Sequence, residues 1–217
     1  MDWLEAQLSG AENGRKFIIT YHIYPGAKYN SKAKANWDET YSNAYFDIIG
    51  QHHDKIVMEI GAHDHFSDIR YHSNKDAATY FYHNILISPG VTPRNKQNPG
   101  FATFDIDLSM TPTNLKMTFL DLDKTFGMES APNDINAVPI NVVDFSKEFG
   151  LKDISAAALS KFKDKLAADN SLTERFMVRK LGFDFNDADQ KSEALDILQN
   201  DIGILTLSKE KTYKYVC

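Results

Sequence analysis

Two runs of β-branched and aromatic residues, each followed by a histidine-bearing segment, constrain the fold of this chain most strongly. The runs cover residues 16–22 and 55–61, and both have the composition of buried strands. Between them, the apolar residues of 41–49 recur at helical spacing. The order predicts strand, helix and strand, as in alternating α/β folds, where ligands bind beyond the carboxyl ends of the strands.

Three histidines stand at these strand ends. His22 ends the first run, and His63 and His65 directly follow the second. If the strands are parallel neighbours, their ends lie about 5 Å apart, and an extended backbone would point His63 and His65 to one side. Imidazole is a common metal ligand, so the three are candidate metal ligands. Two alternatives stay open: a surface pair at 63 and 65, and a structural role for His22. Asp64 either orients an imidazole or is a solvated acid.

The rest of the chain changes from strands to helices. Strands are predicted at 78–88, 101–109 and 114–122, and helices at 155–168, 172–181 and 188–200, with Ser155, Ser171 and Asp187 as possible N-caps. The stretch after residue 128 is rich in Pro, Asn and Asp and has no apolar periodicity. We therefore divide the chain into an α/β part at 1–128, a linker or loop at 129–150 and a helical C-terminal subdomain at 151–217.

Composition excludes several classes of protein. The 217 residues carry a formal charge of -6, which disfavours binding to nucleic acid, and no apolar run reaches the roughly 20 residues of a transmembrane helix. Cys217 is the only cysteine, so an intrachain disulfide and a cysteine zinc site are excluded. The first residues lack the basic start and apolar middle of a signal peptide.

Other polar groups have simpler interpretations. His52 and His53 follow the helix predicted at 41–49, where a cationic side chain favours the helix dipole, so we predict a capping role. Acidic residues alternate along the later strands but lack the glycine and glutamate of a calcium loop, which favours a solvated strand face. These residues are Asp105, Asp107, Asp121 and Asp123.

Several motifs, in order, resemble a known family. Residues 21–26 (YHIYPG) resemble the Gly-His-Ile-Pro-Pro-Gly motif of acid-sphingomyelinase-like phosphodiesterases, a branch of the calcineurin-like metallophosphoesterases. Residues 61–65 (GAHDH) resemble its Gly-His-x-His motif. Residues 88–93 and 98–101 are similar to its Pro-Ser-x-Thr-Pro and Asn-Pro pair, and 145–151 with the helices that follow are similar to its C-terminal subdomain. The resemblance covers most of the chain.

The resemblance implies a fold, a metal site and a chemistry. The fold would be part of a metallophosphoesterase β-sandwich flanked by helices. His22 and His63 would bind one metal and His65 the other, with two zinc ions in the complete site. The substrate would be a phosphodiester such as a phospholipid headgroup or a nucleotide. The resemblance also suggests a secreted or lysosomal location.

Two departures from the family pattern limit what this chain can do alone. Ala62 and Tyr24 replace the motif glycine and a motif proline. The upstream Asp-x-His, Gly-Asp-x-x-Asp and Gly-Asn-His motifs, which supply the remaining ligands and the general-acid histidine, do not occur. We therefore expect no catalytic residue in this chain, no activity from it alone, and completion of the site by an N-terminal half, in the same polypeptide or in a partner. The alternative is a non-catalytic interaction subunit that keeps the fold.

Overall fold

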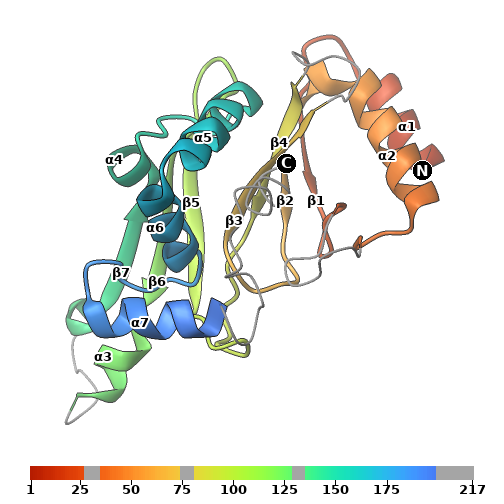
Figure 1. The fold of residues 1–217 in the computed structure, drawn as a ribbon. Coiled ribbons are helices and arrows are strands. Elements are labelled where there is room, and N and C mark those ends of the chain that lie inside the picture. Colours follow the sequence, from red (N-terminus) through yellow and green to blue (C-terminus); the bar gives the residue numbers. More distant parts are fainter. Residues whose placement is uncertain (27–34, 74–80, 129–134, 199–217) are drawn as a thin grey trace.

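The computed structural model describes residues 1–26, 35–73, 81–128 and 135–198, which form two β-sheets with helices around them (Figure 1). The predicted α/β class is confirmed: one sheet is mixed, the other is antiparallel, and both are flanked by helices. The arrangement is compatible with part of a metallophosphoesterase fold. Among the described residues, no helix is long and apolar enough to cross a membrane.

The first sheet carries the two segments that contain the candidate histidines, residues 21–26 after β1 and 62–67 after β2, here called the histidine loops. Its order is β1-β2-β4-β3, with β1–β2 and β2–β4 parallel and β3–β4 antiparallel. The bounds are β1 Phe17–Thr20, β2 Ile56–Gly61, β3 Asp68–Ser73 and β4 Phe81–Ile87.

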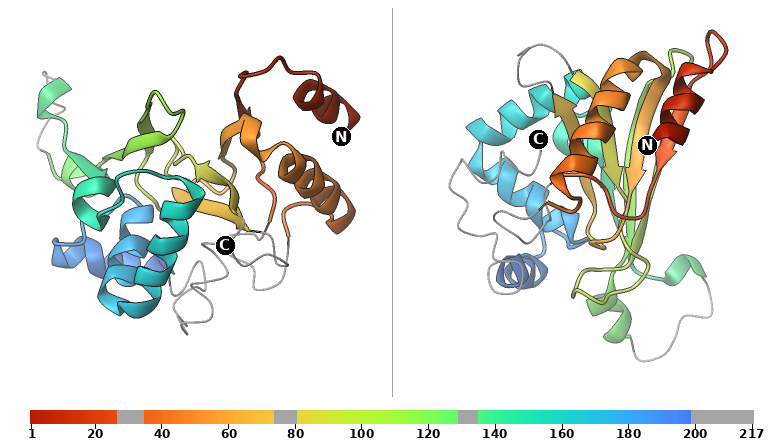
Figure 2. Two further views of the ribbon diagram at one scale, coloured as in Figure 1. Left: turned by 90° about the horizontal axis from the view of Figure 1, so that it is seen from above. Right: turned by 90° about the vertical axis from the view of Figure 1, so that its right-hand side faces the viewer.

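Two helices cover one face of this sheet (Figure 2). Helix α2, Glu39–Gln51, connects β1 to β2 and is followed by the short 3-10 helix η1, His53–Lys55. The side chain of Asp38 caps α2 by accepting from the Thr40 amide. Helix α1, Asp2–Ser9, packs beside α2, and Leu8, Tyr45 and Ile49 are buried there.

The second sheet is an antiparallel meander in the order β5-β6-β7. Its strands are β5 Gly100–Ile106, β6 Pro112–Leu120 and β7 Ile140–Asp144. Helix α3, Leu122–Phe126, and the 3-10 helix η2, Ile135–Ala137, lie between β6 and β7, and helix α4, Phe145–Phe149, follows β7.

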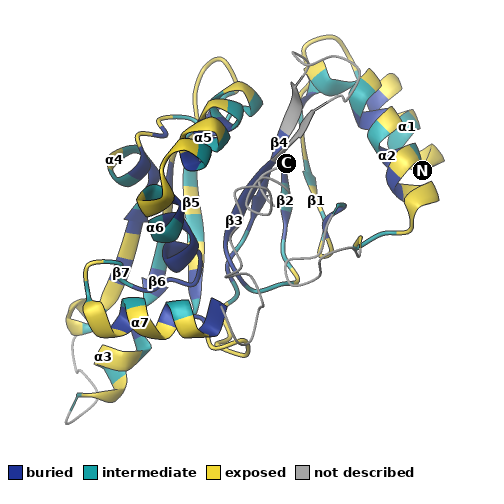
Figure 3. Ribbon diagram, viewed as in Figure 1, coloured by how far each residue is buried: buried dark blue, intermediate teal, exposed yellow. Residues whose placement is uncertain are grey.

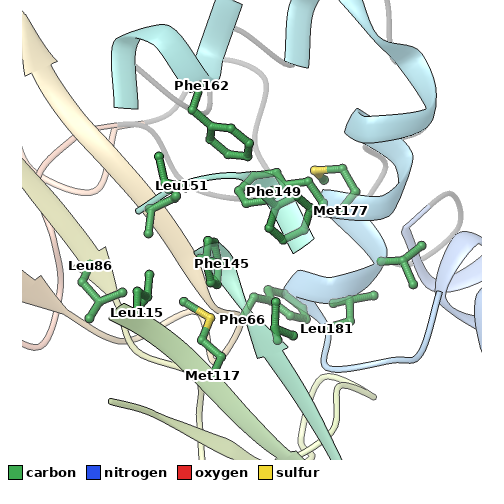
Figure 4. Packing of buried hydrophobic residues seen from close by; sticks show 14 of the residues in the cluster. Phe66, Leu86, Leu115, Met117, Phe145, Phe149, Leu151, Phe162, Met177 and Leu181 are labelled. Carbon is green, nitrogen blue, oxygen red and sulfur yellow. The ribbon is translucent and has the colours of Figure 1, made fainter. Parts of the chain in front are cut away.

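Three C-terminal helices share one core with both sheets (Figure 3). They are α5 Ala156–Ala168, α6 Asn170–Lys180 and α7 Ala188–Asp196. The core joins Leu86 of the first sheet to Met117 of the second and Phe162 of α5 (Figure 4). Met58 of the first sheet belongs to the same core. The division of the chain at 128 and 151 stays a prediction. The C-terminal helices, which the division assigns to a separate subdomain, pack on the strands.

The N-cap predictions are partly right. Ser155 and Asp187 accept backbone amides at the starts of α5 and α7, as predicted. Ser171 is not a cap: Asp169 accepts the Leu172 amide and begins α6 earlier than predicted.

The predicted linker at 129–150 is wrong over 140–149. This stretch forms β7 and α4. The side chains of β7 alternate as in a half-buried strand: Asn141 and Val143 face inward, while Ile140 and Val142 are exposed. The inward amide of Asn141 donates to the Gly182 carbonyl at 3.1 Å, so a residue typical of loops is satisfied inside the sheet. Residues 129–134 lie outside the described part of the chain.

Candidate metal centre

The histidine loops meet because β1 and β2 are parallel neighbours, as predicted. Thr20 pairs with Ile60, so the two strands end at the same edge of the sheet. Beyond that edge the Ala62 amide donates to the His22 carbonyl at 3.0 Å, which keeps the two chains together past the ends of the strands.

His22 and His63 form a close pair. Nδ1 of His63 lies 3.3 Å from Nε2 of His22, and the ring centroids are 5.2 Å apart at an interplanar angle of 82°. Both side chains are exposed. The contact serves either as a hydrogen bond between one N–H and one lone pair or as two lone pairs turned toward one cation.

The backbone at 63–65 differs from the extended conformation that the sequence predicted. His63 has φ 81° and His65 has φ 66°, so both occupy the left-handed region that disfavours residues with a Cβ. The loop is therefore a tight turn rather than a continuation of β2. Strained conformations of this kind persist only where surrounding contacts hold them, and they cluster at functional sites.

His65 is held separately from the other two histidines. Its carbonyl accepts from the Gly90 amide at 2.8 Å, and a Cβ placed on Gly90 would lie 2.9 Å from the Cβ of His65. The segment 88–90 therefore approaches His65 in a way that requires glycine at 90. Nδ1 of His65 is buried and has no hydrogen-bond partner among the residues that the structure describes.

The donor set partly fits zinc. Two nitrogens that each lie about 2.05 Å from a tetrahedral zinc ion are about 3.3 Å apart, which matches the spacing between His22 and His63. Nδ1 of His65, which has no partner within the described part of the chain, is a further nitrogen that could bind a metal. Among the described residues, however, no three His, Cys, Asp or Glu side chains gather closely enough to hold an ion. Since zinc sites use at least three protein ligands, further donors would have to join this pair.

A buried polar network lies behind the histidine loops. The Tyr24 hydroxyl donates to the Asp64 carboxylate and accepts from Nη2 of Arg70 at 3.2 Å. Arg70 also donates from Nε to Asp68 at 3.2 Å, and Asp68 pairs with Nζ of Lys180 at 2.7 Å. The network therefore joins both histidine loops to β3 and to the last residue of α6.

Burial and pairing set the protonation of this network. Burial raises the pKa of Tyr24, so the phenol keeps its proton and remains the donor to Asp64. Burial is the largest single effect on the pKa of Arg70 and would lower it, but the charges of Asp68, Tyr24 and Asp64 together with the hydrogen bond to Asp68 raise this pKa. For Lys180 burial is the stronger effect, and its pKa is lowered despite the pairing with Asp68.

A second buried carboxylate lies under α2. Glu59 is fully buried in β2 and accepts from the Tyr45 hydroxyl at 2.5 Å. Burial raises the pKa values of Tyr45 and Tyr21, and the charge of Glu59 adds to both shifts. Neither polar network was predicted from the sequence, because their members are far apart in the chain. A charged residue within an apolar run, such as Glu59, was the available signal.

The remaining sequence candidates have structural roles. Nδ1 of His53 lies 3.0 Å from the Gly50 carbonyl at the end of α2, in agreement with capping, and Nε2 of His52 lies 3.1 Å from Glu5. The solvated interpretation is wrong for Asp121, which is buried and caps α3 by accepting the Lys124 amide. Cys217 lies outside the described residues.

Comparison with known proteins gives the resemblance an independent basis. No protein-family model matches the chain. Human acid sphingomyelinase-like phosphodiesterase 3b is 24% identical over 187 residues, which cover 81% of this chain and 39% of that protein. Sphingomyelin phosphodiesterase 1 of Caenorhabditis elegans is 25% identical over 189 residues, covering 81% of this chain and 30% of that protein. Sphingomyelin phosphodiesterase 2 of the same organism is 24% identical over 176 residues, covering 79% and 27%.

The extent of the match is as informative as its identity. The chain spans between 27% and 39% of the length of these relatives, while about four fifths of the chain takes part in each alignment. The motif resemblance is therefore confirmed: this chain is similar, over most of its own length, to part of the acid-sphingomyelinase-like phosphodiesterases.

Proposed function

We propose that this chain supplies part of the active site of a metal-dependent phosphodiesterase, with His22 and His63 as ligands of one metal and His65 as a ligand of a second. The observation that supports this most directly is the 3.3 Å approach of two imidazole nitrogens from loops that follow adjacent parallel strands. The relatives are named as phosphodiesterases that act on sphingomyelin or resemble enzymes that do, so the proposed substrate is a phosphodiester.

The division of labour follows from the donor set. When bound, zinc ions in a two-metal site supply Lewis-acid stabilisation of phosphoryl oxygens and an activated water. The histidine loops of this chain would hold and orient that site. The remaining ligands and the general acid would come from an N-terminal half, in the same polypeptide or in a partner chain, because the motifs that carry them are absent from this sequence.

A zinc-binding measurement tests the proposal at the histidine pair. Zinc affinity of the 217-residue chain is measured by competition with a chromophoric chelator, for the wild type, His63→Ala and His52→Ala. His52 is the matched control, because it is a histidine at a helix end that contacts Glu5 and not the pair. We expect weak binding that falls at least tenfold in His63→Ala and is unchanged in His52→Ala. Equal binding by all three would refute the assignment.

Hydrolysis of bis(p-nitrophenyl) phosphate tests the chemistry. We expect no metal-dependent turnover by the chain alone. We expect turnover by the native protein or assembly that contains it, lost on chelation and restored by zinc. A native assembly that is intact, free of metal and inactive would leave the non-catalytic interaction subunit as the explanation.

A further inference from the structure

We propose that Tyr24 and Asp64 are positioning residues whose side-chain hydrogen bond, here named the Tyr24–Asp64 bridge, fixes the two histidine loops against each other. This inference rests on the proposed function, because the geometry that the bridge fixes is that of the histidine pair. Neither residue is among the candidate ligands. In the sequence, Tyr24 was notable only because it replaces a proline of the family motif.

The bridge spans the two loops at matching places. Tyr24 lies two residues after His22, and Asp64 stands between His63 and His65. The hydrogen bond from the Tyr24 hydroxyl to the Asp64 carboxylate therefore closes a short ring through both loops, with the His22–His63 contact on its other side. A second contact, from Nδ2 of Asn95 to the Asp64 carbonyl at 3.2 Å, holds the same residue through its backbone.

Tyr24 is itself immobilised, so it can serve as a fixed point. Its side chain is 1% exposed and packs with Ile85 and Ile87 of β4. The guanidinium of Arg70 lies 4.5 Å from the centre of the Tyr24 ring and also donates to its hydroxyl. Because the hydroxyl accepts from Arg70, its own proton is directed to the carboxylate of Asp64.

The bridge also accounts for the unusual backbone of the second loop. His63 and His65 both have positive φ, a conformation that relaxes unless contacts hold it. Asp64 is the residue between them, and its side chain and its carbonyl are both bound. Removal of the Tyr24 hydroxyl would release the side-chain half of this anchor and leave the ring packing intact.

Tyr24→Phe is therefore the test, and Tyr45→Phe is its matched control. Each substitution removes one phenol hydroxyl that donates to a carboxylate while keeping the ring, but the Tyr45 hydroxyl donates to Glu59 under α2 and not to a residue of the histidine loops. Zinc affinity is measured by chelator competition, and amide hydrogen exchange is followed in the peptide that contains 61–66. We expect Tyr24→Phe to lower zinc affinity by about 10- to 100-fold and to speed exchange at 62–66. Tyr45→Phe should change neither.

The outcomes separate the bridge from the proposed function. Unchanged zinc affinity and exchange in Tyr24→Phe would overturn the bridge, and so would equal losses in both variants, because these would indicate general destabilisation. If the wild type binds no zinc but Tyr24→Phe alone speeds exchange at 62–66, the bridge is supported and the proposed function fails. Asp64→Asn, which keeps an accepting oxygen, should lie between the wild type and Asp64→Ala in both measurements.

Discussion

The histidine end of the first sheet and the aromatic core beneath α4, α5 and α6 differ in almost every physical respect. At the histidine end, His22 and His63 are exposed, and the backbone adopts positive φ. In the core, Phe149, Phe162 and Phe176 are buried, with ring centroids 5.3 to 5.8 Å apart in edge-to-face contact. Edge-to-face packing of buried rings stabilises a fold, whereas strained, exposed imidazoles do not. Stability and proposed chemistry are thus separated in space.

Phe66 is where the two regions join. It directly follows His65 and is buried in the same core as the aromatic cluster (Figure 4). Phe66 therefore anchors the second histidine loop in the stable region.

The largest effect is expected in the aromatic core. Phe176→Ala removes a ring that contacts Phe145, Phe149 and Phe162, and should lower the free energy of unfolding by about 3 to 5 kcal/mol. Urea denaturation measures it. The control is Phe101→Ala on the outer face of β5, where the side chain is 55% exposed and the expected loss is under about 1 kcal/mol. Equal losses of stability in the two variants would show that a ring in the aromatic cluster contributes no more than an exposed ring.

The network between the regions should give the next largest effect. Asp68→Asn removes the negative charge that pairs with Arg70 and Lys180, all three being buried, and should cost about 3 kcal/mol. We expect the low end of the range for a broken buried pair, because the lowered pKa of Lys180 allows it to lose its proton. Urea denaturation measures the loss. Lys147→Ala, at an exposed pair with Asp144, should change stability by less than about 0.5 kcal/mol.

The buried tyrosines should make the stability of the protein depend on pH in the alkaline range. Burial raises the folded-state pKa of Tyr45 above the ordinary tyrosine value of about 10, so the unfolded state loses this proton first and stability falls as pH rises above about 10. Each such tyrosine contributes a slope of about 1.4 kcal/mol per pH unit. Tyr45→Phe should reduce the slope by about 1 kcal/mol per pH unit in urea titrations between pH 10 and 11, because the unfolded-state tyrosine is only partly ionised in that range. An unchanged slope would mean that Tyr45 ionises in the folded protein.

The smallest stability effect is expected at the histidine loop. His63→Gly and His63→Ala both remove the imidazole, but at φ 81° only glycine escapes the steric cost of a Cβ, which is about 1 kcal/mol. His63→Gly should therefore be about 1 kcal/mol more stable than His63→Ala in urea, with zinc affinity reduced equally in both. The reverse order of stability would mean that the loop relaxes once the imidazole is gone.

The sequence predicts the first sheet better than it predicts the site. The strands at 17–20 and 56–61 and the helix between them are long apolar patterns, and their parallel pairing brings His22 to His63 as expected. Strand β3 escaped prediction because Asp68 and Arg70 interrupt its apolar pattern, although both are buried and paired.

The finer geometry of the site had at most a weak local signal. Histidine adopts positive φ more often than most residues, but the conformation is uncommon for any residue other than glycine, so the turn at 63–65 could not be predicted from the two histidines. The Tyr24–Asp64 bridge joins residues 40 positions apart, and the part played by Lys180 depends on where α6 packs. Such contacts are decided by the tertiary fold rather than by spacing along the chain.

The contacts between the start of β3 and the end of α6 set an order of events during synthesis. The amide and the hydroxyl of Ser67 both donate to the carbonyl of Lys180, and Asp68 binds its ammonium group, across more than a hundred residues of chain. Contacts of such separation form late, because the intervening loop must close first. A nascent chain therefore completes the contacts behind its histidines only after residue 180 has left the ribosome, so the proposed site would mature later than the two strands that carry its loops.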